Sequence, residues 1–98
     1  MREPRPAYTY LLASAPYGVL YCGSTLDLMR RVHEHRTGLG AAFTRKYGVA
    51  TLVWFETHAL LNEAFIREQA IKRWRRAWKI ILIEEPNPRW DDLYVELL

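Results

Sequence analysis

The sequence has little cysteine and no long apolar run. Cys22 is its single cysteine, which excludes an internal disulfide and a cysteine-based zinc cluster and is compatible with a reducing cytoplasm. No apolar stretch approaches the roughly 18–20 residues that span a bilayer, so we expect a cytoplasmic protein without membrane contact. Residues 1–6 are charged and contain proline, with no hydrophobic segment behind them. We therefore expect a short disordered leader there rather than a secretion signal.

Size and composition indicate one small globular domain. The chain has 98 residues, of which 50% are hydrophobic and 26% charged, as in an ordinary domain with its own core. A domain of this size buries only about 60–70% of its unfolded surface, which leaves little room for a deep pocket. We expect the folded domain over residues 7–94, a tail over 95–98, and an open site on the surface.

Charge is unevenly distributed along the chain. Residues 1–79 hold 13 Lys or Arg against 6 Asp or Glu, a net charge of +7, whereas residues 80–98 hold one Arg against 5 Asp or Glu, a net charge of −4. A basic body with an acidic end is typical of a protein that binds a polyanion on one face. The pattern favours nucleic acid as the partner; the alternative is a soluble surface with uneven charge.

Strand-forming residues and turn signals predict three strands, at residues 8–14, 19–23 and 51–57. Pro16 and Gly18 lie between the first two strands, which therefore form an antiparallel hairpin. A helix is expected over residues 27–36, followed by a basic loop over 41–48.

A longer helical pattern runs over residues 59–84. As one helix it would be about 39 Å long, too long for a domain whose radius of gyration is about 13 Å, so we expect a break near residues 73–76. The order of elements predicts an α+β fold, with a three-stranded antiparallel sheet flanked by helices. The residues of the apolar face recur at three- and four-residue steps: Leu61, Ala64, Phe65, Ile71, Trp74, Trp78, Ile81 and Leu82.

The junction between the second strand and the first helix gathers polar groups. Asp27, Arg31 and His35 are spaced i, i+4, i+8 and share one helix face, while Tyr21 and Gly23 end the strand before it. A hydroxyl, a guanidinium and an imidazole can thus converge, and Gly23, which lacks a Cβ, would let a backbone or a phosphate approach closely. The alternative is a surface pair of Asp27 with Arg31 and an idle His35.

Glu68 is a carboxylate on the apolar face of the second helical region. Its neighbours at −4 and +3 are Ala64 and Ile71, so it points toward the core. A lone carboxylate there is costly unless it is paired or binds a metal. The alternatives at this point are a metal ligand and a salt bridge to a residue such as Arg31.

Residues 71–79 interleave five cations with Trp74 and Trp78. We expect both tryptophans in the core and the cations on a solvated flank, where they can neutralise phosphates. Two cations of the predicted loop could extend this surface. The candidate phosphate-binding residues are Arg45, Lys46, Lys72, Arg73, Arg75, Arg76 and Lys79.

Taken in order, several of these residues resemble the GIY-YIG nuclease family over about residues 7–93. The first motif retains only its final tyrosine, and the second retains its tyrosine and glycine. The chain is most similar to small single-domain bacterial members, through a REQAIKRW-like helix at 67–74 and an NPxWxDL-like ending at 87–93. The residues that carry the resemblance are Tyr8-Thr9-Tyr10, Tyr21-Cys22-Gly23, Arg31, His35, Glu68 and Asn87.

The resemblance implies phosphodiester hydrolysis with one divalent metal ion, Mg²⁺ or Mn²⁺, held by Glu68. Tyr21 would activate a water molecule, and Tyr10 would hydrogen-bond that water or Tyr21. Arg31 would hold the scissile phosphate, and His35 would orient a tyrosine or relay a proton.

The resemblance also implies that Asn87 ties the C-terminal segment to the site. The predicted function is a DNA endonuclease that acts on branched, nicked or damaged DNA in repair or recombination. Two alternatives are kept: a catalytically weak nucleic-acid-binding module, and a subunit whose nuclease activity needs a partner protein.

Overall fold

The computed structural model describes residues 5–98 and is built on a three-stranded antiparallel sheet. The first strand lies in the centre and pairs with both of the others. In their order across the sheet the strands are β2 (Leu20–Thr25), β1 (Ala7–Ala13) and β3 (Thr51–His58). All three were predicted to within two residues at each end, and the outer strand β2 carries residues of the candidate site.

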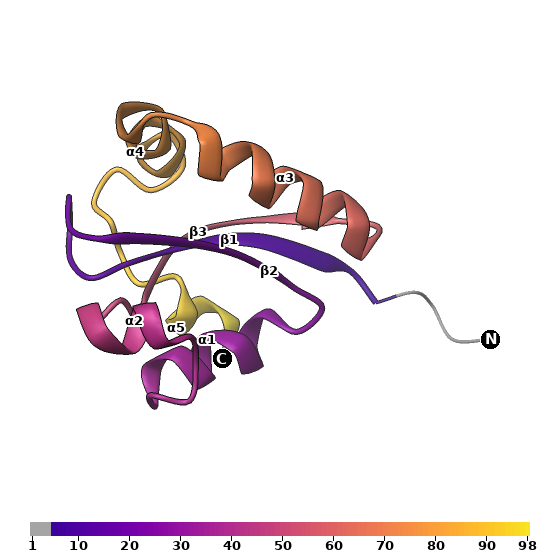
Figure 1. Ribbon diagram of the computed structural model, residues 1–98, viewed down its shortest axis with the longest axis horizontal. Coiled ribbons are helices and arrows are strands. Elements are labelled where there is room, and N and C mark those ends of the chain that lie inside the picture. Colours follow the sequence, from indigo (N-terminus) through magenta and orange to yellow (C-terminus); the bar gives the residue numbers. More distant parts are fainter. Residues whose placement is uncertain (1–4) are drawn as a thin grey trace.

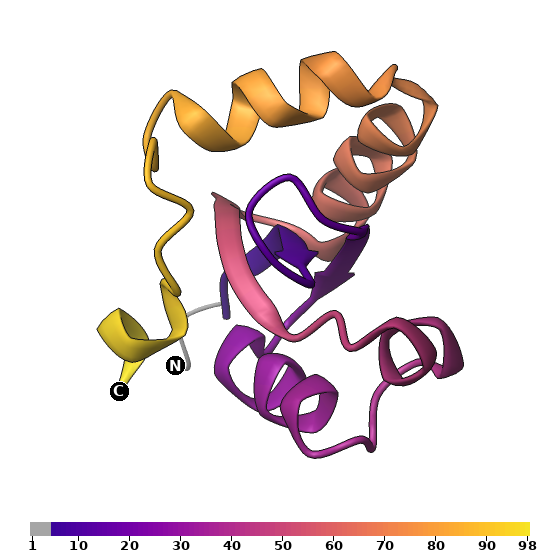
Figure 2. The ribbon, with the colours of Figure 1, turned by 90° about the vertical axis from the view of Figure 1, so that its left-hand side faces the viewer.

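Helices cover both faces of the sheet, so the expected α+β architecture is confirmed (Figures 1 and 2). One face packs against α3 (Leu61–Arg73) and α4 (Arg76–Glu84). The opposite face packs against α1 (Leu28–Arg36), α2 (Ala42–Tyr47) and α5 (Tyr94–Leu97). No helix within residues 5–98 is long and apolar enough to cross a membrane.

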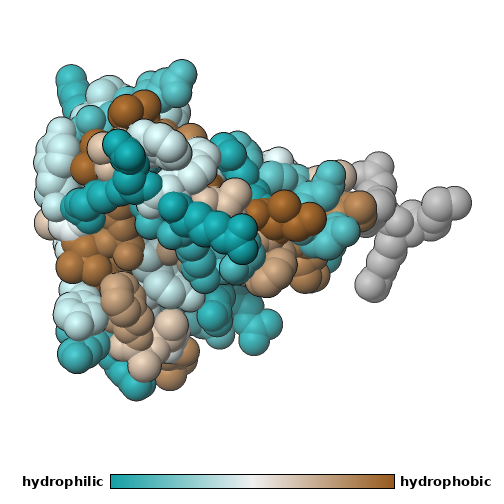
Figure 3. Space-filling model, turned by 45° about the horizontal axis from the view of Figure 1, so that its top comes forward, coloured by the Kyte–Doolittle hydropathy of each residue, from teal (hydrophilic) through white to brown (hydrophobic). Residues whose placement is uncertain are grey.

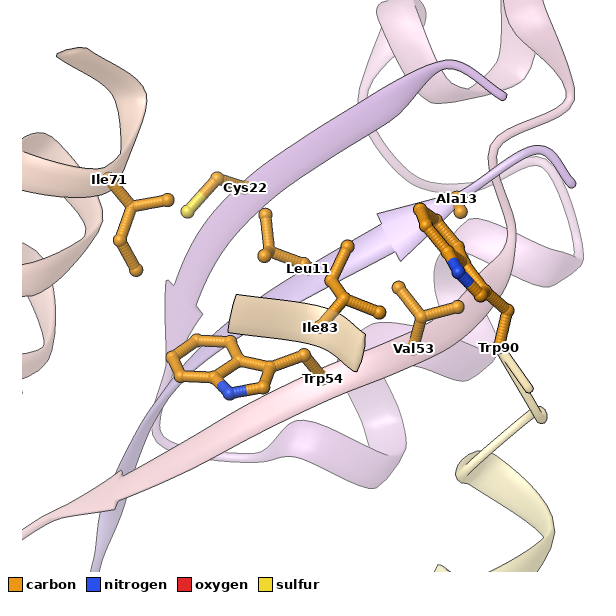
Figure 4. Packing of buried hydrophobic residues seen from close by; sticks show 8 residues of the cluster. All are labelled: Leu11, Ala13, Cys22, Val53, Trp54, Ile71, Ile83 and Trp90. Atoms are coloured by element: carbon orange, nitrogen blue, oxygen red, sulfur yellow. The ribbon is translucent and has the colours of Figure 1, made fainter. Parts of the chain in front are cut away.

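Alternation along the strands divides the buried side chains into two clusters, because successive strand residues point to opposite faces. On the central strand, Leu11 and Ala13 belong to the cluster under α3 and α4, which also contains Ile71, beside Cys22, and Ile83 (Figure 4). Tyr10 and Leu12 point the other way, into the cluster beneath α1. Each face therefore has its own small core, and the candidate site lies where the two faces meet at β2.

The predicted break in the long helical region is confirmed. Helix α3 ends at Arg73 and α4 begins at Arg76, and the two residues between them, Trp74 and Arg75, have extended backbone angles. The break resets the helical period, so the predicted apolar face does not continue into α4. Trp78 and Ile81 are 51% and 62% exposed, contrary to the prediction that they lie in the core.

The buried face of α3 is also narrower than predicted. It consists of Ala64, Glu68 and Ile71, whereas Leu61 and Phe65 are exposed. Apolar side chains accordingly appear among hydrophilic ones on the α3–α4 side of the molecule (Figure 3). The position of Glu68 on the buried stripe agrees with the prediction.

Residues 41–48 were expected to be a loop, and the structure instead has the short helix α2 there. The helix ends at Gly48, which has a positive φ of 64°. The only buried residue of α2 is Thr44. Its sequence therefore lacks the periodic apolar pattern from which a helix is predicted.

The chain ends are bound to the fold where the structure describes them. Residues 1–4 of the predicted leader lie outside the described residues, but Arg5 donates a hydrogen bond to the Leu26 carbonyl at 3.3 Å. In the predicted tail, Leu97 of α5 packs against the α1-side cluster beside Tyr94. Residues 95–97 therefore belong to the folded domain.

Candidate active site

The candidate site begins with the register of β1 and β2, which places Tyr10 opposite Gly23. A Cβ on residue 23 would lie 2.4 Å from the Tyr10 hydroxyl and 2.6 Å from its Cζ. Such contacts are far shorter than van der Waals distances, so only glycine leaves room for the end of the Tyr10 ring. The close approach predicted for Gly23 is thus taken by the Tyr10 side chain rather than by a backbone or a phosphate.

A chain of hydrogen bonds runs from Tyr10 through His35 to α2. The Tyr10 hydroxyl lies 3.2 Å from His35 Nε2, and His35 Nδ1 lies 2.9 Å from the hydroxyl of Thr44. That hydroxyl donates its single hydrogen to the Ala41 carbonyl at 2.8 Å, so it accepts from His35 Nδ1–H. A neutral His35 then has an unprotonated Nε2, which accepts the hydrogen bond of Tyr10.

Gly40 and Thr44 hold His35 in place, and neither was among the predicted site residues. A Cβ on residue 40 would lie 2.4 Å from His35 Nδ1, so glycine is needed for the loop to pass the imidazole. Thr44 lies in the segment predicted as a loop, and nothing in the sequence indicates that its hydroxyl binds a site residue. Only the folded position of α2 identifies these two residues.

Burial keeps Tyr10 and His35 uncharged at neutral pH. Desolvation raises the pKa of Tyr10 well above its ordinary value, Tyr21 and Glu68 raise it further, and hydrogen bonding from Arg31 together with its charge works in the opposite direction. Desolvation, helped by the charge of Arg31, lowers the pKa of His35. Tyr10 and His35 therefore form a hydrogen bond between two neutral groups rather than an ion pair.

Tyr21 joins the same aromatic group from the outer strand. Its ring centroid lies 5.2 Å from that of His35 and 6.4 Å from that of Tyr10, and Phe43 of α2 lies on its other side at 6.2 Å. Tyr21 is half-buried, whereas Tyr10 is buried. The imidazole therefore contacts both tyrosines, but its hydrogen bond goes to Tyr10.

The alternative interpretation of the first helix, a surface pair of Asp27 with Arg31 and an idle His35, is not what the structure contains. Asp27 caps α1 by accepting from the Arg30 N–H and pairs with Arg5 at 3.6 Å rather than with Arg31. Arg31 instead lies 3.4 Å from Glu34, and His35 is buried rather than idle on the surface.

Glu68 reaches the site from the α3 side of the sheet. It is 7% exposed, and its Oε1 accepts a hydrogen bond from Ser24 at 2.6 Å. Its Oε2 forms an ion pair with Lys72 at 2.5 Å and accepts from Gln69 at 3.3 Å. The salt-bridge alternative is thus realised, with Lys72 in place of the predicted Arg31.

The two halves of the site meet at the outer strand. Tyr10 lies against Gly23 from one face, and Glu68 binds the next residue, Ser24, from the other. The charge of Glu68 acts on Tyr10 across this strand, raising its pKa. Residues from both faces therefore surround one short segment of β2, an exposed edge rather than an enclosed pocket.

Two predicted substrate-binding residues have structural partners away from this edge. Arg76 donates to the carbonyls of Tyr17 and Gly18 at 2.6 Å each, which ties α4 to the hairpin turn. Asn87 is buried beside β3, where its amide donates to the carbonyl of Val53 at 3.0 Å. Because β3 lies on the opposite side of β1 from β2, Asn87 ties the C-terminal segment to the sheet and not to the β2 edge.

The other predicted cations are exposed, except for Lys79 of α4, which is half-buried. Arg45 and Lys46 lie on α2, and Arg73 ends α3. Arg75 stacks over the ring of Trp78 at 5.2 Å, a cation–π contact on the surface. These residues remain available to phosphates, in contrast to Arg76.

The donor set at the edge fits a hydrated divalent cation. Within residues 5–98 no group of three or more His, Cys, Asp or Glu side chains could enclose an ion, which speaks against a site built only of protein ligands. Mg²⁺ keeps most of its waters and needs only one or two carboxylates, and Mn²⁺ accepts the same ligands. Glu68 can serve through Oε1, which keeps a second lone pair beyond the one used by Ser24, whereas Oε2 already accepts from both Lys72 and Gln69.

Comparisons with known proteins identify the family of the chain. The model of the GIY-YIG catalytic domain matches residues 6–80. A UPF0213 protein of Bacillus pumilus is 40% identical over 83 residues, covering 85% of this chain and 84% of the relative. A UPF0213 protein of Haloquadratum walsbyi is 40% identical over 78 residues, covering 80% of this chain and 86% of the relative.

A solved structure shows the same fold. The solution NMR structure of the UPF0213 protein BH0048 from Bacillus halodurans superposes with a TM-score of 0.54 at 30% identity, covering 89% of this chain and 92% of the other. The domain match spans both tyrosine strands and the Glu68 helix, and the relatives match over nearly their whole length. The chain therefore belongs to the GIY-YIG catalytic domain family, among the small UPF0213 proteins.

Proposed function

We propose that this protein is a metal-dependent endonuclease that hydrolyses phosphodiester bonds in DNA. The observation that carries the proposal is the meeting of two groups at one strand edge. Tyr21, whose ring lies 5.2 Å from that of His35, and Tyr10, which lies against Gly23, approach β2 from one face, and Glu68 binds Ser24 from the other. A water-activating phenol and a metal-binding carboxylate are the two parts that such hydrolysis requires.

In this proposal the tyrosines act on the attacking water. Tyr21, the less buried of the two, first loses its hydroxyl proton to solvent and, as a phenolate, takes a proton from the attacking water. A phenolate forms only where cations stabilise its negative charge, and Lys72 lines the same hollow as Tyr21. His35 accepts the hydrogen of Tyr10, which turns the lone pairs of the Tyr10 oxygen toward Tyr21 or the water.

Cations of the site act on the phosphate. The planar guanidinium of Arg31 suits two phosphate oxygens, and its partner Glu34 is a partly exposed surface contact that a phosphate can replace. A divalent ion bound at Glu68 would polarise the phosphoryl oxygens and stabilise the leaving oxygen. The exposed edge suits a large substrate, because the nucleic acid itself covers the site.

Branched, nicked or damaged DNA is the proposed substrate, in repair or recombination. A catalytically weak nucleic-acid-binding module is the second candidate, and one observation favours it: the ion pair of Glu68 with Lys72 satisfies the carboxylate without any metal. A third candidate is a subunit whose nuclease activity needs a partner protein.

A cleavage assay separates these functions. Purified protein is incubated with flap, fork, nicked, duplex and single-stranded DNA, in Mg²⁺, Mn²⁺ or EDTA. A nuclease cuts only with metal, and both Glu68→Gln and Tyr21→Phe lower the rate at least about a hundredfold while DNA binding is kept.

The matched control is Glu63→Gln on the exposed part of the same helix, which should cut like the wild type. A binding module would give salt-sensitive gel shifts without cuts in any metal. A dependent subunit would cut only after cell extract is added, and cleavage that survives Glu68→Gln would refute the proposed role of that carboxylate.

A further inference from the structure

Two hollows lie along β2, one on each side of the candidate site. The first has a volume of about 430 Å³ and is polar; it begins at Ser24 and Thr25, and its rim holds three arginines and their two carboxylate partners: Arg5, Arg30, Arg31, Asp27 and Glu34. The second has a volume of about 280 Å³ and begins at Leu20, Tyr21 and Cys22. A strand of nucleic acid that follows β2 past Tyr21 and Ser24 would meet both hollows.

The second hollow, which we call the Phe43 hollow, has an apolar floor and a cationic rim. Leu11, Leu20 and Cys22 form the floor, and burial raises the pKa of the Cys22 thiol to about 12, so that it stays uncharged. Phe43 forms one wall and is 43% exposed. This combination suits a flat aromatic group and does not suit a phosphate or a metal ion.

The cations of the Phe43 hollow lie where the backbone of a bound nucleotide would run. Lys72 and Lys79 line the hollow from the α3–α4 side, opposite the ring of Phe43. Aromatic platforms beside cations are the usual means of binding a nucleotide strand, because bases stack on the ring while phosphates meet the charge. The arginine-rimmed hollow, by contrast, suits a phosphate alone.

We infer that the Phe43 hollow binds the unstacked base of the nucleotide next to the scissile phosphate, so that the substrate is nucleic acid with an unpaired nucleotide at the cleavage position. The inference rests on the proposed function and specifies its substrate. A paired base is stacked inside its helix and cannot enter a hollow in the protein surface, whereas a base in a flap, gap or mismatch is already free or easily unstacked. The Phe43 hollow thus selects substrate structure rather than sequence.

The test is a double-mutant cycle of binding affinities, in which one change removes the Phe43 ring and the other removes the base from the substrate. Affinities are measured by fluorescence anisotropy in EDTA, where no cleavage occurs, for duplexes with one unpaired nucleotide and for the same duplexes with an abasic unit at that position. Phe43→Ala should weaken binding of the first substrate at least about fivefold and leave binding of the abasic one unchanged. Phe43→Tyr, which keeps the ring, should behave like the wild type.

Phe65→Ala is the matched control, since Phe65 is 52% exposed on α3 and does not line the hollow; it should bind both substrates like the wild type. Equal losses on both substrates with Phe43→Ala, or equal wild-type affinity for paired and unpaired DNA, would overturn the inference. Cleavage without this coupling leaves the nuclease proposal standing and rejects the base site. Coupling without cleavage supports the base site and rejects the nuclease proposal. If the protein binds none of the substrates, both proposals are rejected.

Discussion

A single methyl group at residue 23 would occupy the space that the Tyr10 phenol needs. The Gly23→Ala variant must therefore displace the Tyr10 ring and with it the hydrogen bond to His35. We expect a loss of about 1–3 kcal/mol in the free energy of unfolding, as for other overpacked cores. Cleavage should fall about a hundredfold, because a displacement of about 1 Å can cost that much. Urea unfolding and cleavage rates check both values.

Gly38→Ala provides the comparison at the residue scale. Gly38 has a φ of +82°, and a Cβ there meets nothing within 4 Å. Its replacement costs about 1–2 kcal/mol through backbone strain but leaves the site intact, so cleavage should be kept. If both variants cut equally well, the close fit of Tyr10 against Gly23 is not needed for catalysis.

One face of helix α3 carries both the core residue Ile71 and the site residue Glu68. Ile71 is fully buried among the residues under α3 and α4, while Ile66 on the same helix is 65% exposed. Ile71→Ala should lower the free energy of unfolding by about 2–5 kcal/mol, and Ile66→Ala should change it by no more than about 0.5 kcal/mol. Urea denaturation measures both. Equal costs would mean that α3 is rotated, and Glu68 would then not point at Ser24.

The whole molecule should become less stable on mild acidification because it holds His35 neutral. The pKa of His35 is lowered in the folded state. At a pH below about 6.5, the ordinary pKa of histidine, the unfolded chain therefore binds a proton at this residue more readily than the folded chain does. Stability therefore rises with pH through this window and is lost as the pH falls from about 6.5 toward the lowered pKa. Urea unfolding at pH 7.5 and 5.5 should show the wild type losing more stability than His35→Gln.

Burial sets the direction of this effect by lowering the pKa of His35; the charge of Arg31 lowers this pKa further, and the charge of Glu34 raises it. The lowered pKa of Glu84, caused by hydrogen bonds from Tyr17 and Trp90, acts in a different window, below the ordinary glutamate pKa of 4.5. A wild-type protein whose stability changes no more than that of His35→Gln between the two pH values would show that His35 is not held neutral.

Local patterns were enough to predict the sheet, the first helix and the break between α3 and α4. The strands are rich in strand-forming residues, Pro16 and Gly18 mark a turn, and a helix of about 39 Å does not fit a domain of this size. The same local information predicted Tyr21, Arg31 and His35 as neighbours, because they are close in sequence and lie at a strand–helix junction. The face of α4 was mispredicted because a helical period does not continue through extended residues.

By itself the sequence determined the order of the three strands and the longer helices, which depends on residue type and short-range spacing, while the residues expected to carry hydrolysis were indicated by their resemblance to the GIY-YIG family. Tertiary structure alone decided that Thr44 holds His35, that Ser24 binds Glu68 and that Asn87 lies beside β3. The physical reason is the strand order β2-β1-β3: long-range pairing sends the last strand to the far edge and leaves β2 open. Which residues distant in sequence come together therefore depends on which strand lies at each edge of the sheet.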